Sequence, residues 1–204
     1  MADAAHHGDA TRARIIQTAL ALIADRGFAA TSTREISERL GFTKAALYYH
    51  FRTKEDLLAA IIEPAMEDLR RLVGTGAPDS GDPADATPAL RRRLMAGYVD
   101  LVTAHADLIR VLSNDPAVRA CAPLASSMTL YEQLVQLLSA SRDPDLAQRT
   151  RVRCALGAVH AGILHGAPSP ADGDVAREVT LSVACAAIGV SAGAPRRHMS
   201  AARA

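Results

Sequence analysis

The sequence has few aromatic residues and no tryptophan. Its 204 residues include three Phe and four Tyr, whereas alanine fills 42 positions. Sheets favour aromatic and β-branched side chains, and alanine has the highest helix propensity. The composition therefore excludes an all-β core and predicts an all-α fold. The length is sufficient for one or two domains that bury a hydrophobic core.

Cysteines and long apolar runs are also scarce. The three cysteines stand far apart and form no C-x-x-C pair, which excludes a disulfide framework and fits a reducing compartment. The first 14 residues lack the apolar core of a signal peptide. The longest uncharged stretch, 179–195, is too rich in small residues to span a bilayer. We therefore expect a cytoplasmic protein with no membrane partner.

The motifs of common enzymes and metal sites are missing as well. The sequence contains no Gly-rich phosphate loop, no G-x-S-x-G and no H-E-x-x-H, so we expect neither an enzyme nor a cofactor. His160 and His165 would point about 140° apart on one helix, and Cys154 does not complete a tetrahedral set with them. An intersubunit metal site stays open as an alternative.

Positive charge and aromatic residues gather near the N-terminus, although the formal net charge is only +1. Residues 1–54 contain eight Lys or Arg against five Asp or Glu, whereas the rest of the chain contains 15 against 17. Five of the seven aromatic residues lie between Phe28 and Phe51. A basic region of this kind is weak evidence for a polyanionic partner.

Apolar spacing predicts three helices near the N-terminus. Residues 11–26 carry apolar side chains on one helical face and are followed by Gly27. Ser32 begins a Ser-x-x-Glu capping box for a short second helix, which we expect to end at Gly41. A third helix of about two turns is predicted over 44–51, so that two short helices meet across a tight turn.

Further helices are predicted downstream. Thr53 caps a fourth helix, in which Pro64 predicts a kink or a local break. Residues 74–87 are rich in Gly, Pro and Asp and predict a long surface loop. Later helix starts are marked by a capping residue followed by proline, at Thr87-Pro88, Asp115-Pro116 and Asp143-Pro144. The segments 146–165 and 175–190 are rich in Ala and Gly, which permits close packing of a helix pair.

The stretch from Thr31 to Leu58 carries the strongest functional signal. A helix-turn-helix unit places its second helix in the major groove, where side chains near the helix start reach base edges. Lys44 can donate to guanine, and Ala45 leaves room for close approach to the bases. The tyrosine, histidine and lysine residues that follow can reach phosphates. The alternative is an ordinary helical corner with a solvated face.

This stretch resembles the TetR family of transcriptional regulators. The resemblance is carried by residues 41–51 and 54–58, GFTKAALYYHF and KEDLL, together with Thr33 and Ile36 upstream. It implies a homodimeric repressor with a three-helix DNA-binding domain and a helical domain that binds a small effector. The DNA partner that it implies is a double-stranded operator.

The resemblance also implies which residues contact DNA and which segments form the dimer interface. The implied DNA contacts are Thr33, Arg34, Thr43, Lys44, Ala45, Tyr48, Tyr49, His50 and Lys54. The implied dimer interface is formed by 146–165 and 175–190. The chain then divides into a helix-turn-helix domain over 9–52 and an effector-binding and dimerisation domain over 53–192. Two disordered tails are expected at 1–8 and 193–204.

Candidate effector contacts are the polar or soft side chains on the apolar stripes of the middle helices. They are Met66, Met95, Tyr98, His105, Met128 and Tyr131. Because few aromatic residues lie in this region, an aliphatic effector is favoured over a flat aromatic one. Two alternatives stay open: a metal- or redox-responsive regulator of the same fold, and a helical DNA-binding module without an effector.

Overall fold

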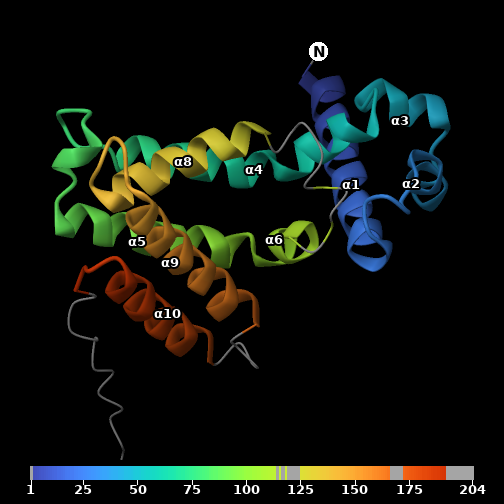
Figure 1. The fold of residues 1–204 in the computed structure, drawn as a ribbon. Helices are drawn as coiled ribbons and strands as arrows, with labels where there is room; N and C mark the ends of the chain where they lie inside the picture. The colour runs from blue at the N-terminus through green and yellow to red at the C-terminus, as the bar shows by residue number, and fades with distance from the viewer. Residues whose placement is uncertain (1, 114, 116–117, 119–124, 166–171, 192–204) are drawn as a thin grey trace, which may run out of the picture. The chain divides into compact units, whose positions relative to one another are not determined.

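The computed structural model describes residues 2–191, except 114, 116–117, 119–124 and 166–171, and every element in this part of the chain is helical (Figure 1). The helices are α1 (Ala2–Arg26), α2 (Thr33–Leu40), α3 (Lys44–His50), α4 (Lys54–Thr75), α5 (Pro88–Ala104), α6 (Ala106–Ser113), α8 (Ala125–Ser139), α9 (Leu146–His165) and α10 (Gly173–Ala187), with a 3₁₀ turn, η1, at Pro83–Asp85. The predicted all-α fold is confirmed. The expected tail at 193–204 lies outside the described residues.

The chain forms two compact units, each built from two stretches of sequence. One contains residues 1–71 and 105–131, and the other contains residues 72–104 and 132–204. The first unit therefore includes α1, α2, α3 and α6 with most of α4, and the second includes α5, α9 and α10. The domain limits inferred from the sequence stay a prediction.

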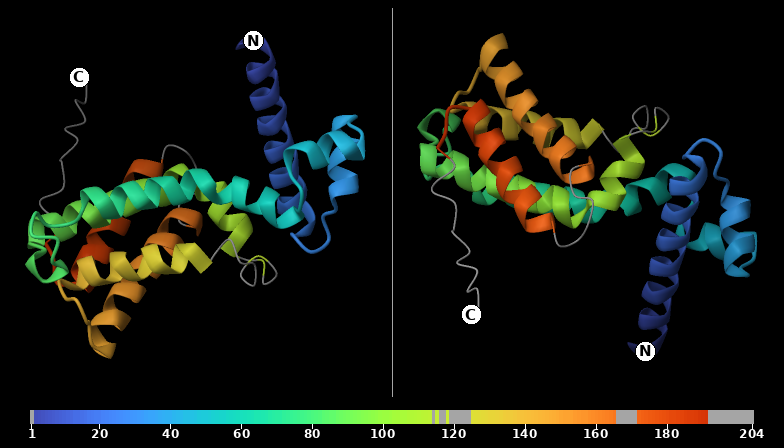
Figure 2. Two further views of the ribbon diagram at one scale, coloured as in Figure 1. Left: turned by 90° about the horizontal axis from the view of Figure 1, so that it is seen from above. Right: turned by 90° about the horizontal axis from the view of Figure 1, so that it is seen from below.

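The helices of the first unit bury one common core. On α1 the predicted apolar stripe is buried, with Ile15 and Ala19 fully inaccessible. Leu47 of α3, Leu58 of α4 and Leu108 of α6 lie in the same core. α1 packs on α2, and α2 packs on α3 (Figure 2). Burial of each large apolar side chain contributes about 1.5–3 kcal/mol, so this core holds the three N-terminal helices in place.

Two helices are longer than the sequence predicted. α1 continues back to Ala2, so that residues 2–8, expected to be a disordered tail, are helical. α4 runs without a break through Pro64 and includes the first residues of the predicted loop. Alanine favours the extension of α1. Ile61 and Ala65 are buried on either side of the proline, so packing against the core outweighs the one backbone hydrogen bond that proline removes.

The cap of α5 follows the prediction, whereas the cap of α9 does not, although α9 spans the predicted segment 146–165. Thr87 caps α5, because its Oγ1 accepts a hydrogen bond from the backbone at Leu90. α9 is capped by Asp145, whose carboxylate accepts from the N–H of Gln148 at 2.7 Å, while Gln148 Oε1 accepts from the N–H of Asp145 at 2.8 Å. This reciprocal pair satisfies two free N–H groups, so the helix begins after Asp145 rather than after Asp143.

The helices α9 and α10 lie side by side in the second unit, and both pack against α5 (Figure 1). Gly162 allows the close approach, because a Cβ atom at this position would lie 2.1 Å from Thr180 Oγ1. Gly157, by contrast, faces open space. The small residues of α9 therefore serve two faces: one packs against α10 and the other is uncovered in the single chain.

Candidate nucleic-acid interface

The turn between α2 and α3 sets the start of α3. Gly41 adopts a left-handed backbone with φ 68°, which glycine reaches without strain. Phe42 N–H then donates to the carbonyl of Ser37 at 2.9 Å. Thr43 caps α3, because its Oγ1 accepts from the N–H of Ala46 at 3.2 Å. The predicted glycine stop and threonine cap are therefore both present.

α3 presents polar and aromatic side chains to solvent. Leu47 anchors the helix in the core, whereas Lys44 and Ala45 are exposed. Tyr49 is 86% exposed and Tyr48 is 39% exposed. Large aromatic side chains are normally buried or placed at an interface. The exposed side chains of α3 therefore contribute little to the core and are suited to contact a partner.

The exposed face of α3 continues onto the start of α2. Tyr48 joins the two helices, since its hydroxyl lies 3.5 Å from Thr33 Oγ1. Lys44 Nζ lies 5.6 Å from the centroid of the Tyr48 ring. Tyr49 and His50 meet edge to face, with ring centroids 5.3 Å apart. Several of the predicted DNA contacts thus lie on one surface.

Arg34, a predicted phosphate contact, already has a carboxylate partner. Its Nε donates to Glu38 Oε1 at 2.7 Å, and both side chains are exposed. This hydrogen bond raises the pKa of Arg34 above its usual value. A phosphate at this position would compete with Glu38 for the guanidinium.

Lys54 differs from the other predicted contacts, because its ammonium is engaged within the protein. It donates to the carbonyl of Phe28 and, at 3.4 Å, to that of Ala29, and it lies 4.2 Å from the Phe28 ring centroid. Asp115 accepts from the N–H of the same Phe28. We call these contacts of Lys54 and Asp115 with Phe28 the Phe28 clamp. Pro116, where a helix was predicted to begin, lies outside the described residues.

Two arginines that the sequence analysis did not single out lie beside the ends of α3. Arg12 Cζ is 5.2 Å from the centroid of Phe51, and Arg14 Cζ is 5.4 Å from the centroid of Phe42. In the sequence, only the basic composition of the N-terminal region indicated that these two arginines could belong to a binding surface. Their ring partners lie far downstream in the sequence, so no local pattern predicts these contacts.

The candidate effector residues divide between the two units. The first unit contains Met66, His105, Met128 and Tyr131, and the second contains Met95 and Tyr98. Tyr98 is buried, and its hydroxyl lies 2.9 Å from His160 Nε2. His105 Nε2 lies 2.8 Å from the carboxylate of Asp68, and this hydrogen bond lowers the pKa of Asp68. Met128 is exposed. The effector assignment stays a prediction.

Within the described residues, no group of three or more His, Cys, Asp or Glu side chains could hold a metal ion. His160, considered above as a ligand, has Tyr98 as a hydrogen-bond partner, and burial lowers its pKa. Cys154 is exposed on α9. None of the helices in the part of the chain covered by the structure is long and apolar enough to cross a membrane.

Comparison with known sequences points to the same segment as the geometry. The family model for bacterial regulatory proteins of the tetR family matches residues 15–61. The HTH-type transcriptional regulator TtgR of Pseudomonas putida is 34% identical over 92 residues, which cover 45% of this chain and 43% of TtgR. The chain therefore matches less than half the length of its curated relatives.

Solved structures extend the likeness to most of the chain. SCO3833 of Streptomyces coelicolor, described as a member of the TetR transcriptional regulator family, has a TM-score of 0.62 and 21% identity, over 86% of this chain and 89% of its own. AibR, solved with isovaleryl coenzyme A and operator DNA, has a TM-score of 0.61 and 24% identity, over 84% and 96%. These likenesses establish the fold. The family model thus places the helix-turn-helix segment, residues 15–61, among the bacterial regulatory proteins of the tetR family, and the rest of the described chain has the fold of TetR-like regulators.

Proposed function

We propose that this chain is a homodimeric transcriptional repressor that binds operator DNA through α2 and α3 and is released by a small-molecule effector. The observation that carries the proposal is the exposed face of α3, where Lys44, Tyr48 and Tyr49 lie directly after a capped turn. Lys44 and Ala45 face base edges, because they stand at the start of the helix that enters the groove. The tyrosine hydroxyls contact phosphates.

The remaining contacts at the edges of α2 and α3 position the protein on the DNA backbone. Thr33 and Thr43 stand at helix starts, where a hydroxyl and free backbone N–H groups can donate to phosphate. Arg34 exchanges its carboxylate partner for phosphate, and His50 adds a donor at the end of α3. Lys54 contributes through the Phe28 clamp, which holds the turn between α1 and α2.

The proposed dimer interface is formed by α9 and α10. Val175, Val179 and Val183 stand four residues apart on α10 and are 64%, 56% and 52% exposed. A row of exposed branched apolar residues on one helical face is typical of a surface that another protein covers. Gly157 faces open space on α9, which would allow a second copy to approach closely. The two α3 helices would then read half-sites about 34–36 Å apart, or a multiple of this distance.

A small-molecule effector is supported by the likeness to AibR, which was solved with both a coenzyme A thioester and operator DNA. The scarcity of aromatic side chains outside the first 51 residues favours an aliphatic effector. TetR-family regulators are not enzymes, and the proposal includes no reaction. We place the protein in the cytoplasm, where operator DNA is accessible.

Selection of bound duplexes from a random pool of double-stranded DNA, using the full chain, tests this proposal. We expect enrichment of a near-palindromic sequence, and we expect one member of a metabolite library to release the enriched duplex. Lys44→Ala should weaken binding by about tenfold or more and relax one base preference, since a good base contact contributes about 1–3 kcal/mol.

The two parts of the proposal fail separately. If no sequence is enriched and no duplex binds, DNA binding itself is contradicted. If a duplex is enriched but no metabolite in the library releases it, the effector part is contradicted while the DNA-binding part stands.

A further inference from the structure

Arg12 and Arg14 differ from most arginines of the first unit, because their partners are aromatic rings rather than carboxylates. Ion pairs with Asp or Glu are formed by Arg26, Arg34, Arg70, Arg71 and Arg110. Among the described residues, no carboxylate pairs with Arg12 or Arg14. Both side chains are exposed, so their charge is available to a partner.

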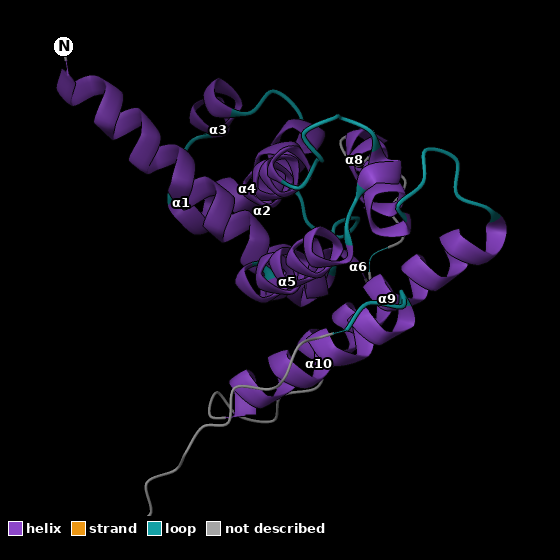
Figure 3. Cartoon of the chain, turned by 90° about the vertical axis from the view of Figure 1, so that its left-hand side faces the viewer, coloured by secondary structure: helices purple, strands orange, loops and turns teal. Residues whose placement is uncertain are grey.

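The two rings adjoin opposite ends of α3. Phe42 precedes the N-cap residue of α3, and Phe51 is its C-cap. Because α3 has seven residues, it is about 10 Å long. Arg12, over Phe51, and Arg14, over Phe42, therefore stand near the two ends of the exposed helix. Figures 1 and 3 show the N-terminal half of α1 beside α3.

A guanidinium over an aromatic ring is well prepared to bind phosphate. The ring attracts the cation through its quadrupole and uses none of the five N–H donors for this contact. The contact also restricts the long side chain before any partner arrives, so less entropy is lost when phosphate binds. Arginine held by a carboxylate, as at Arg34, has to give up that partner first.

We propose that Arg12 and Arg14 contact the backbone phosphates on either side of the groove that α3 enters, so that α1 is part of the DNA-binding surface. The inference rests on the DNA-binding function proposed above. Phe42 and Phe51 then have a second role beyond core packing, since their rings support the two arginines. Phosphate contacts carry no sequence information, so the pair contributes affinity and salt dependence rather than base preference.

Salt-dependent titrations of Arg12→Ala, Arg14→Ala and the double variant with the enriched duplex test the inference. Each lost phosphate contact should reduce the slope of log K against log salt by about 0.9 and weaken binding about five- to tenfold at about 100 mM KCl. The base preference should stay that of the wild type. A duplex with neutral methylphosphonates at the flanking phosphates should weaken binding of the wild type but not of the double variant.

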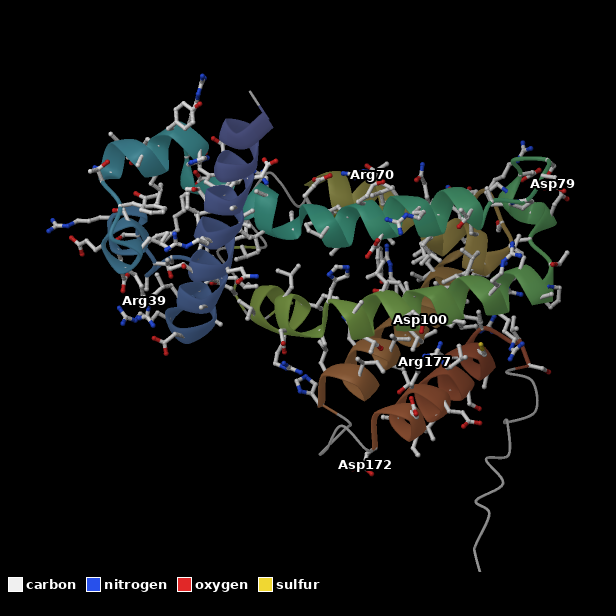
Figure 4. The ribbon with its side chains drawn as sticks, turned by 180° about the vertical axis from the view of Figure 1, so that it is seen from behind. Arg39, Arg70, Asp79, Asp100, Asp172 and Arg177 are labelled. Carbon is white, nitrogen blue, oxygen red and sulfur yellow. The ribbon has the colours of Figure 1, made fainter. Side chains whose placement is uncertain are left out.

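Two sets of variants separate a lost contact from lost folding. Arg39 stands six residues after Thr33, which places it about 120° around α2, and Figure 4 shows its side chain on the far side of α2 from α3. Arg39→Ala should therefore leave the salt slope unchanged. Arg12→Lys and Arg14→Lys keep the charge and should retain most of the slope, and thermal unfolding of every variant reports its stability.

The outcomes distinguish this inference from the proposed function. If the wild type binds the duplex and the double variant binds within about twofold of it with the same slope, the inference is overturned and the function stands. A changed base preference in the double variant also overturns it, because phosphate contacts do not read bases. If the wild type binds no duplex at any salt concentration, both the inference and the function fail.

Discussion

Lys44 and Lys54 are both predicted DNA contacts, but their surroundings assign them different roles. Lys44 is exposed on α3, whereas Lys54 donates to backbone carbonyls in the Phe28 clamp. Lys54→Ala should lower the free energy of unfolding by about 1–2 kcal/mol, because it removes the hydrogen bond of a charged donor to the Phe28 carbonyl and the contact of the ammonium with the Phe28 ring. Lys44→Ala should change that free energy by less than about 0.5 kcal/mol and mainly weaken DNA binding.

Urea unfolding and salt-dependent titration of the two variants check this assignment. If Lys54→Ala unfolds like the wild type while its salt slope falls by about one, Lys54 is a phosphate contact after all. In that case the ammonium leaves Phe28 when DNA binds.

His160 should make the stability of the protein depend on pH. Burial lowers its pKa below the usual value of 6.5, so the unfolded chain binds a proton at pH values where the folded protein does not. The stability that the buried, neutral His160 contributes to the folded protein is therefore fully present above pH 6.5. It is lost as the pH falls below this value, because the unfolded chain then takes up the proton. Between about pH 7.5 and about pH 5.5, the wild type should lose more free energy of unfolding than His160→Gln.

Urea unfolding at both pH values measures this difference. Glutamine can still hydrogen-bond to Tyr98, so the variant removes the titration and keeps the polar contact. His165→Gln, at an exposed position of α9, controls for the loss of one imidazole. Parallel losses of stability in the wild type and His160→Gln would show that His160 does not titrate on unfolding.

Contacts within one helical turn were predictable from the sequence, and contacts between distant segments were not. Ser32 Oγ accepts from the N–H of Glu35 at 3.1 Å, as the capping box predicts. The hydrogen bond between Tyr98 and His160 joins residues 62 positions apart, and the carbonyl of Phe28 lies 26 residues before Lys54. Local patterns define caps, but side-chain partners of this kind depend on how whole helices pack.

At the scale of elements, two glycines of α9 should respond in opposite ways to the same substitution. A Cβ at Gly162 would lie 2.1 Å from Thr180 Oγ1, and Thr180 is buried. Gly162→Ala should therefore force α9 and α10 apart and cost about 1–3 kcal/mol. Within a single chain Gly157→Ala meets open space, so in the monomer it should be neutral or stabilise the helix by about 0.5–1 kcal/mol. Chemical unfolding at a protein concentration low enough to keep the chain monomeric compares the two variants without the dimer contact.

Helix boundaries were less predictable than the helices themselves. Pro64 predicted an interruption of α4, yet the helix continues because Ile61 and Ala65 are buried on both sides of it. α9 spans the predicted segment 146–165, but its cap is Asp145 rather than the predicted Asp143, since the reciprocal hydrogen bonds with Gln148 satisfy two backbone groups. Tertiary packing and competing caps decide such boundaries.

At the scale of the whole molecule, composition sufficed for the fold class, but not for the division into units. The first unit takes in residues 105–131 from the middle of the chain. It does so because Leu108 joins the core of the N-terminal helices and Asp115 binds the N–H of Phe28. The apolar stripe of α6 predicts that it packs, but not which helices it packs against.

A dimer interface on α9 and α10 would make one substitution decisive for the whole assembly. Val179 is the middle member of the exposed valine row. Val179→Lys would place a charge without a partner in the apolar contact, at a cost of about 3 kcal/mol or more, and so weaken dimerisation more than about 100-fold. Analytical ultracentrifugation at micromolar concentration should show a dimeric wild type and a monomeric variant. The variant should keep its affinity for a single half-site and lose affinity for the full palindrome.

Gln133→Lys adds the same charge at an exposed position of α8 and should remain a dimer. A Val179→Lys protein that sediments like the wild type would place the interface elsewhere. A monomeric wild type would show that no second copy of the chain covers the exposed valine row. A single α3 would then have to supply the whole affinity for DNA, and the enriched sequence should contain one half-site rather than two.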